Sequence, residues 1–201
     1  MDGTLADSEP TALAALKNAL AEIGIPSIPN LQDCTLGLAA DAIHNWLVLE
    51  HGLSETRTDW ERRKHRHHLS ALGELRAFSA ALSVYRALEA AGIPQAVVSN
   101  SDRLIMDAQL RHIGVTKPEL ITVARNDVRK GKPDPEGYLR AAWLLGIAQE
   151  DCLVVEDSPS GIAAGLAAGM TTCLVPHSDV KIAADRTLSA MDDILALVGL
   201  D

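Results

Sequence analysis

The sequence predicts an α/β protein with a Rossmann-like parallel sheet, interrupted early in the chain by a helical insertion. Two observations lead to this fold class. The second half alternates apolar, β-branched segments with helical segments of roughly 10–15 residues, which is typical of a parallel sheet covered on both faces. Residues 10–78 contain three segments of helical periodicity and no convincing strand. We therefore expect a core formed by residues 1–9 and 79–201 and a helical domain formed by residues 10–78.

The expected strands are short apolar runs that end in polar residues. They are QAVVSNS, ELITVA, DCLVVEDS and TTCLVP, beginning at residues 95, 119, 151 and 171. The expected core helices have helical periodicity and start or stop signals such as Pro135 near a first turn. They cover residues 102–114, 133–147, 159–169 and 188–199. Those of the insertion cover residues 11–26, 39–52 and 57–75.

The composition is that of an ordinary acidic globular chain, with 47% hydrophobic and 22% charged residues. A net charge of −9 argues against a nucleic-acid partner, although the local field of a site can still attract a phosphorylated substrate. We find no signal peptide and no apolar run that could span a membrane, so we expect a cytoplasmic protein with no membrane partner. Cys152 and Cys173 stand in apolar runs and are interpreted as buried, reduced thiols. Nothing in the sequence demands more than a monomer.

Polar residues stand where the predicted strands end. Residues 99–101 (Ser-Asn-Ser) follow AVV, and residues 156–158 (Glu-Asp-Ser) follow CLVV. GKPDP, at 131–135, lies in the loop before a helix, and DGTL, at 2–5, opens the chain. Ligands of open α/β sheets bind at the carboxyl ends of the strands. A hydroxyl, a lysine and several carboxylates are therefore expected to form a phosphate-and-metal site there.

Electrostatics decides what such a site needs. Two like charges about 4 Å apart repel by roughly 4 kcal/mol at an effective dielectric of about 20. Asp2, Glu156, Asp157 and a phosphate dianion would not be stable together without a cation, and Mg²⁺ suits such oxygen ligands. Lys132 adds a positive charge suited to a phosphate or a neighbouring carboxylate.

Each segment has a simpler interpretation when taken alone. DGTL can be a surface turn, Ser99 and Asn100 can cap the next helix, and GKPDP can be a loop and helix start. The pair Glu156-Asp157 is harder to dismiss, because carboxylates at the end of an apolar strand are costly unless they are paired or bind a metal. The order of all four segments is more specific than any one of them.

Together the segments resemble the motifs of the haloacid dehalogenase superfamily, in the helical-cap branch that includes phosphoglycolate phosphatases and β-phosphoglucomutases. The first motif, Asp-x-Asp-Gly-Thr, is matched by MDGT, and the second by Ser99 in VVSNS. The third is matched by Lys132 in GKPDP, and the fourth by Glu156-Asp157 in VVEDSPSGI. The resemblance covers essentially the whole chain and implies that residues 10–78 form the cap.

The resemblance also implies roles for the acidic residues. Asp2 would be the general acid/base, and its backbone carbonyl would ligate Mg²⁺. Asp157 would be the main protein ligand of the metal, with Glu156 beside it as a direct or water-mediated ligand.

The substrate phosphate would be held by a second set of residues. By resemblance these are Gly3, Ser99, the Asn100 amide and Lys132, of which Lys132 would also neutralise the nucleophile. The implied function is Mg²⁺-dependent hydrolysis of a small phosphorylated metabolite, a phosphomonoester, through an aspartyl-phosphate intermediate. The alternative is an inactive relative that binds a phosphometabolite or a protein partner.

One motif is incomplete. The nucleophilic Asp of the family, and the first core strand that carries it, would stand immediately before Met1. Either the reading frame extends upstream of Met1, or the chain is a truncated form without activity. We favour the first, because the remaining site residues are intact. Without that strand, a slot between two parallel strands would leave backbone groups unpaired.

The insertion bears on the reaction type. No His stands near Ala12, and Ala40, in the loop after Gly37, replaces the Arg with which β-phosphoglucomutases grip a second phosphate, so a mutase is disfavoured. A haloacid dehalogenase is also disfavoured, because those enzymes lack the aspartate that Asp2 represents. The basic segment at 62–68, RRKHRHH, is interpreted as a solvated helix face. A weaker hypothesis is that it attracts an acidic substrate.

Overall fold

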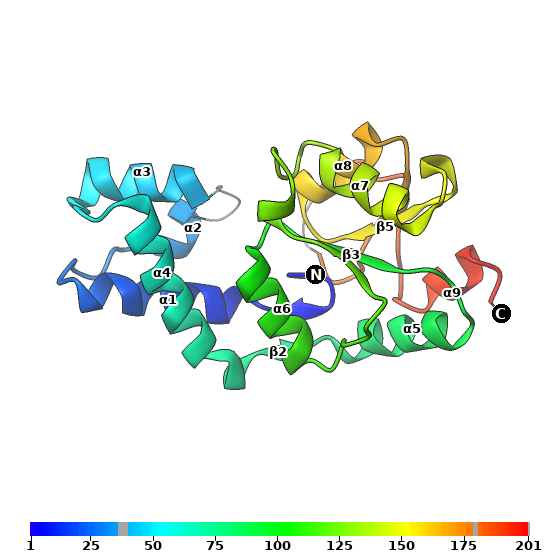
Figure 1. Cartoon of the computed structure of the whole chain (residues 1–201), viewed down its shortest axis with the longest axis horizontal. Helices are drawn as coiled ribbons and strands as arrows, with labels where there is room; N and C mark the ends of the chain where they lie inside the picture. The colour runs from blue at the N-terminus through cyan, green and yellow to red at the C-terminus, as the bar shows by residue number, and fades with distance from the viewer. Residues whose placement is uncertain (36–39, 179–180, 201) are drawn as a thin grey trace. The chain divides into compact units, whose positions relative to one another are not determined.

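The computed structural model describes residues 1–35, 40–178 and 181–200. The chain forms two compact units, one of Met1–Asp7 with Arg76–Asp201 and one of Ser8–Leu75 (Figure 1). The unit boundaries lie at 7/8 and 75/76, compared with 9/10 and 78/79 predicted from the sequence. Each unit has its own hydrophobic core.

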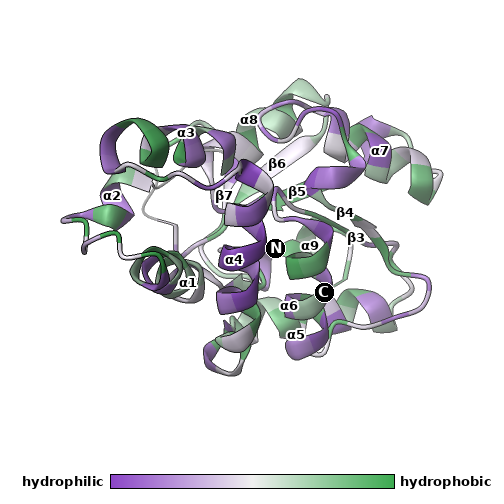
Figure 2. Cartoon of the chain, turned by 60° about the vertical axis from the view of Figure 1, so that its left-hand side comes forward, coloured by the Kyte–Doolittle hydropathy of each residue, from purple (hydrophilic) through white to green (hydrophobic). Residues whose placement is uncertain are grey.

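The helical unit is built around two packed helices, α1 (Glu9–Glu22) and α4 (Arg57–Ser70). It also contains α2 (Leu31–Thr35) and α3 (Ala40–His51), followed by the 3₁₀ turn η1 (Leu72–Glu74). Apolar side chains at helical spacing on these helices form its core, which includes Leu16, Leu20, Leu47 and Trp60. The exposed face of α4 is polar, and the helix is drawn mostly in purple in Figure 2.

The described part of the core unit contains two parallel sheets and one antiparallel pair. In the first sheet β3 (Ala96–Val98) pairs with β4 (Ile121–Val123). The second joins β5 (Leu153–Glu156), β6 (Thr171–Leu174) and β7 (Arg186–Thr187) in that order. The antiparallel pair is β1 (Ala6–Asp7) with β2 (Arg76–Ala77). The predicted α/β class with parallel strands is confirmed, but in the described residues no ladder joins β3 to β5.

Five helices of the described residues belong to this unit. They are α5 (Ser79–Ala90), α6 (Arg103–His112), α7 (Glu136–Leu145), α8 (Pro159–Ala167) and α9 (Asp193–Leu197). Local signals start α8, because the Ser158 hydroxyl accepts a hydrogen bond from Gly161 N (3.1 Å) and Pro159 fits the first turn. Two further 3₁₀ turns are η2 (Arg125–Asp127) and η3 (Gln149–Asp151).

Two predictions about the elements need correction. The stretch expected to lack strands includes β2, which is only two residues long and is stabilised by pairing with β1, so it leaves no alternating pattern in the sequence. The last helix is shorter than the predicted 188–199. Leu188 N instead continues the sheet by donating to Leu174 O, and the Asp193 carboxylate accepts from Ser189 N (2.8 Å) and Ala190 N (3.0 Å) just before α9.

An apolar cavity of about 330 Å³ lies between the facing edges of β3 and β5. Its wall includes Val97 and Val98 from β3, Val154 and Val155 from β5, and Val84 from α5. Because neither edge is paired across the cavity, their backbone groups lack the ladder bonds of a continuous sheet. No helix in the described ranges is long and apolar enough to cross a membrane.

Candidate active site

The carboxyl ends of β3 and β5 are joined by one lysine. Lys132 Nζ donates to the backbone oxygen of Val98, at 2.9 Å, and forms an ion pair with the Glu156 carboxylate. Both charged side chains are almost fully buried, with exposed fractions of 8% for Lys132 and 4% for Glu156. The lysine of GKPDP and the glutamate of VVEDSPSGI are therefore direct neighbours.

The Glu156 carboxylate is surrounded by donors. Its Oε1 accepts from Lys132 and from the Tyr138 hydroxyl (2.6 Å), and its Oε2 accepts from the Ser158 hydroxyl (3.0 Å). Burial by itself raises the pKa of Glu156, but the charges of Lys132 and of the Met1 amino group and the hydrogen bonds from Lys132 and Tyr138 outweigh it and hold the pKa below its ordinary value. Burial also raises the pKa of the Tyr138 phenol well above its usual range, so this hydroxyl remains a donor.

Asp2 is oriented by the segment that follows β3. Its Oδ2 accepts hydrogen bonds from the hydroxyls of Ser99 (2.7 Å) and Ser101 (3.0 Å). Ser99 Oγ in turn accepts from Ser101 N, at 2.9 Å. The structure thus brings together Asp2 and Ser99, which the sequence predicts as site residues, and adds Ser101.

The Asn100 side chain holds the lysine loop. Asn100 Oδ1 accepts from Lys132 N (2.9 Å), and Asn100 Nδ2 donates to Lys132 O (3.0 Å). A Cβ atom on Gly131 would lie 2.5 Å from Asn100 Oδ1, so the close approach of the two segments requires glycine there. The Asn100 side chain therefore positions the Lys132 backbone, which leaves its backbone amide for the contact that the resemblance implies.

Asp157 lies against the loop that opens the chain. The Thr4 hydroxyl donates to Asp157 Oδ1 at 3.1 Å, and a Cβ on Gly3 would lie only 2.0 Å from Asp157 Oδ2. Gly3 also has a φ of +67°, which a residue with a side chain rarely adopts. Burial raises the pKa of Asp157, and the Glu156 charge raises it further.

The predicted site residues therefore form three contacting groups in the core unit: Asp2 with Ser99, Lys132 with Asn100 and Glu156, and Gly3 with Asp157. Across the described ranges, no three His, Cys, Asp or Glu side chains gather closely enough to hold a metal ion by themselves. Tyr138 and His177 are further residues of the site that the sequence did not indicate. Thr4 and Ser101 lie in the segments 2–5 and 99–101, but the sequence predicts no role for them. Ser101 had a readable signal, because it is a second hydroxyl in the polar segment that follows the strand.

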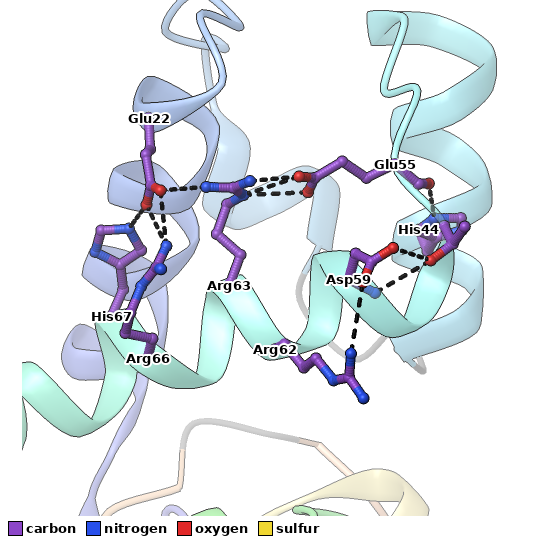
Figure 3. Close-up of polar contacts among 9 residues, drawn as sticks. Glu22, His44, Glu55, Asp59, Arg62, Arg63, Arg66 and His67 are labelled. Atoms are coloured by element: carbon purple, nitrogen blue, oxygen red, sulfur yellow. Dashed lines mark hydrogen bonds and ion pairs between the residues drawn. The ribbon is translucent and has the colours of Figure 1, made fainter.

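The basic segment of α4 is not a solvated face throughout (Figure 3). Arg63 pairs with both Glu22 and Glu55, and Arg66 and His67 also bind Glu22, at 2.7 and 2.6 Å. The hydrogen bond from His67, followed by those from Arg66 and Arg63, lowers the pKa of Glu22 to about 2. The predicted solvated face is therefore corrected to an ion-pair network that ties α4 to α1.

The fold and the site define an α/β protein with a parallel sheet, and with charged groups suited to a phosphoryl group at the carboxyl ends of its strands. A profile of the haloacid dehalogenase-like hydrolases matches residues 1–175, and the chain belongs to this family.

Named relatives agree with this assignment. The chain is 33% identical to hexitol phosphatase A of Escherichia coli over 171 residues, which cover 84% of this chain and 77% of the relative. It is 29% identical to the plasmid-encoded phosphoglycolate phosphatase of Cupriavidus necator, covering 98% of this chain and 90% of the relative. A crystal structure of a family hydrolase from Deinococcus radiodurans, with bound phosphate and sodium, is 30% identical and superposes with a TM-score of 0.71, covering 98% and 92% of the two chains. The predicted family, fold class and phosphatase type of enzyme are confirmed.

Proposed function

We propose that the protein hydrolyses a small phosphomonoester through an aspartyl-phosphate intermediate, with a nucleophilic Asp encoded immediately upstream of Met1. One observation carries the proposal. The oriented carboxylate of Asp2, the buried Lys132–Glu156 pair and Asp157 lie at one end of β3 and β5. Charged groups of both signs fixed in a partly dry site are what phosphoryl transfer requires.

The cavity between β3 and β5 supports an upstream strand. A strand entering between two parallel neighbours would satisfy both unpaired edges and fill an apolar space of about 330 Å³, whose wall includes Met1. Burial lowers the pKa of the Met1 amino group, because a buried ammonium loses its hydration. An uncharged peptide bond at this position would avoid that cost.

The residues present fit a hard divalent cation such as Mg²⁺. Asp157 offers a carboxylate whose pKa is raised by burial and by the neighbouring Glu156 charge, and the donor set of the loops is made of oxygen atoms. Asp157 and the backbone carbonyl of Asp2 would hold the ion directly. Glu156 would act through water, because both of its oxygens already accept hydrogen bonds from protein groups. When bound, the ion would neutralise charge on the phosphoryl oxygens.

The chain's own residues then have distinct tasks. Asp2 would give a proton to the leaving alcohol and later take one from the attacking water, while Ser99 and Ser101 hold its Oδ2. Lys132 would bring positive charge to the phosphoryl group and the nucleophile. The backbone amide of Asn100 would donate to a phosphoryl oxygen. The Ser99 hydroxyl and the Gly3 amide, which here donate to Asp2 Oδ2 and Ala6 O, would have to exchange those partners to do the same.

Simple hydrolysis is the proposed reaction, rather than phosphoryl transfer within a sugar. Ala12 lies within α1 and Ala40 begins α3, and neither side chain can serve as a base or bind a second phosphate. Gly37, which marks the corresponding loop, lies outside the described residues. The helical unit is proposed to be the cap, and a small phosphorylated metabolite is the proposed substrate class.

The test uses the protein expressed from its own gene with the native upstream region. Its intact mass should exceed the 21.4 kDa of this chain, and it should hydrolyse p-nitrophenyl phosphate only with Mg²⁺. Asp157→Asn should lower kcat by about 100-fold or more, since it removes the ligand charge. Asp33→Asn, on the exposed part of α2, should leave kcat unchanged. A fully active Asp157→Asn variant would refute the site, and an inactive wild type would favour a binding role.

A further inference from the structure

His177 follows β6 and reaches the loop that carries Asp2. Its Nε2 lies 2.7 Å from the backbone oxygen of Gly3, a residue 174 positions away in the chain. A carbonyl oxygen only accepts hydrogen bonds, so Nε2 must carry the proton in this contact. No motif used to recognise the site includes His177.

Two other contacts fix the imidazole and its neighbour. The ring stacks on Phe78, with centroids 4.2 Å apart and planes inclined by 27°. Phe78 N donates to Leu5 O at 3.0 Å, so the stacking partner is tied to the same opening loop. The next residue, Ser178, donates its hydroxyl to the backbone oxygen of Asp157 at 2.7 Å. Two consecutive residues thus hold the two loops that carry the acidic groups.

The geometry of Gly3 makes this contact consequential. Gly3 N donates to Ala6 O at 2.8 Å, and Gly3 O accepts from His177, so both sides of the residue are held. The Asp157 carboxylate lies directly over the Gly3 Cα, as the 2.0 Å approach to a built Cβ shows. A shift of Gly3 would therefore change the separation of the Asp2 and Asp157 carboxylates.

We propose that His177 is a positioning residue, whose hydrogen bond to Gly3 sets the placement of Asp2 relative to Asp157. The role in catalysis rests on the proposed function, whereas the effect on the loop does not. The backbone brings His177 to this place because β6 is parallel to β5, with Leu174 opposite Glu156, so the segments that follow both strands leave the sheet at the same edge.

The experiment compares two substitutions that separate the ring from the donor. His177→Phe keeps an aromatic ring for stacking on Phe78 and removes the N–H, whereas His177→Gln keeps an N–H donor and removes the ring. His112→Gln, at the exposed end of α6, is the matched control. The first measurement is amide hydrogen exchange by NMR in the 21.4 kDa chain.

Exchange at the Gly3, Thr4 and Leu5 amides should accelerate by about tenfold in His177→Phe and remain near the wild-type rate in His177→Gln. The amides of β4 report on the global stability of the unit, and their exchange rates should not change in either variant. Unchanged exchange of the loop amides in His177→Phe would overturn the proposal, whatever the activity. Equal acceleration in both variants would overturn it too, because stacking rather than the donor would then hold the loop.

Kinetics with p-nitrophenyl phosphate and Mg²⁺ then tests the catalytic consequence in the protein with its native upstream region. His177→Phe should lower kcat by about tenfold and raise the Mg²⁺ concentration for half-maximal activity, with KM little changed, because a displaced acid/base costs rate rather than binding. His177→Gln should restore most of the rate. An unchanged kcat in His177→Phe would overturn the positioning role. If the wild type shows no hydrolysis, the proposed function fails, and the exchange data still decide whether His177 holds the loop.

Discussion

Lys132 and Glu156 form an ion pair that is shielded from water on nearly all sides, with 8% and 4% of their side chains exposed. Bringing two charges out of water costs several kcal/mol per ion, and their attraction repays this only when further hydrogen bonds complete the site. Here Val98 O, the Tyr138 hydroxyl and the Ser158 hydroxyl supply those bonds. The stability of the buried ion pair therefore depends on both charges and on the groups that donate to or accept from them.

Removing both charges should cost less free energy of unfolding than the sum of removing each one alone. Lys132→Met leaves Glu156 buried without its cation and should lower the free energy of unfolding by about 3–5 kcal/mol. The double variant Lys132→Met/Glu156→Gln should lose less than the sum of the single changes. Urea unfolding measures each value, and Lys130→Met, whose side chain is 78% exposed, is the control. Additive single and double effects would contradict a coupled pair.

The Tyr138 hydroxyl should contribute stability through its bond to a charged oxygen. Tyr138→Phe removes a 2.6 Å hydrogen bond to Glu156 while keeping the ring, so the free energy of unfolding should fall by about 2 kcal/mol. Tyr85→Phe, on α5, is the matched change in the same unit and should cost less. Equal losses of unfolding free energy in the two variants would show that the hydrogen bond to Glu156 does not stabilise the fold.

Gly161 should not tolerate a side chain. A Cβ there would lie 1.9 Å from Glu156 Oε2, so Gly161→Ala must displace the carboxylate that holds Lys132. We expect a loss of roughly 2 kcal/mol or more in unfolding free energy, even though alanine favours helices. Gly73→Ala, where nothing lies within 4 Å, should be nearly neutral. Thermal unfolding measures both variants, and equal melting temperatures for Gly161→Ala and Gly73→Ala would contradict the prediction.

The ion-pair network of the helical unit should give acid-sensitive stability. The pKa of Glu22 falls from 4.5 to about 2 on folding, so its contribution is present above pH 4.5 and is lost as the pH drops from 4.5 toward 2. Glu22→Gln should therefore reduce the melting temperature at pH 7 and make little difference at pH 2. Calorimetry of both proteins across this range measures the effect, and a constant difference between them would rule it out.

Much of the core could be read from the sequence, because its signals are local. The apolar runs at AVV, ITV, LVVE and TTCL became β3 to β6, and the Ser158-Pro159 start of α8 was recognisable from capping chemistry. The two-residue strands β1, β2 and β7 could not be predicted from the sequence, because so short a strand exists only where a partner strand pairs with it. The same holds for the basic run of α4, whose partners Glu22 and Glu55 stand on other segments.

By itself the sequence determined the four longer strands β3 to β6, the helices α6, α7 and α8 that alternate with them, and the chemical groups that follow each strand, because these depend on neighbouring residues. It did not indicate α5 or α2. Only the tertiary structure decided which groups meet. Glu156 could have faced a metal, yet it is paired with Lys132, 24 residues away, and His177 contacts Gly3 across 174 residues. Such contacts follow from strand register and from how loops leave the sheet, and these depend on packing across the whole unit.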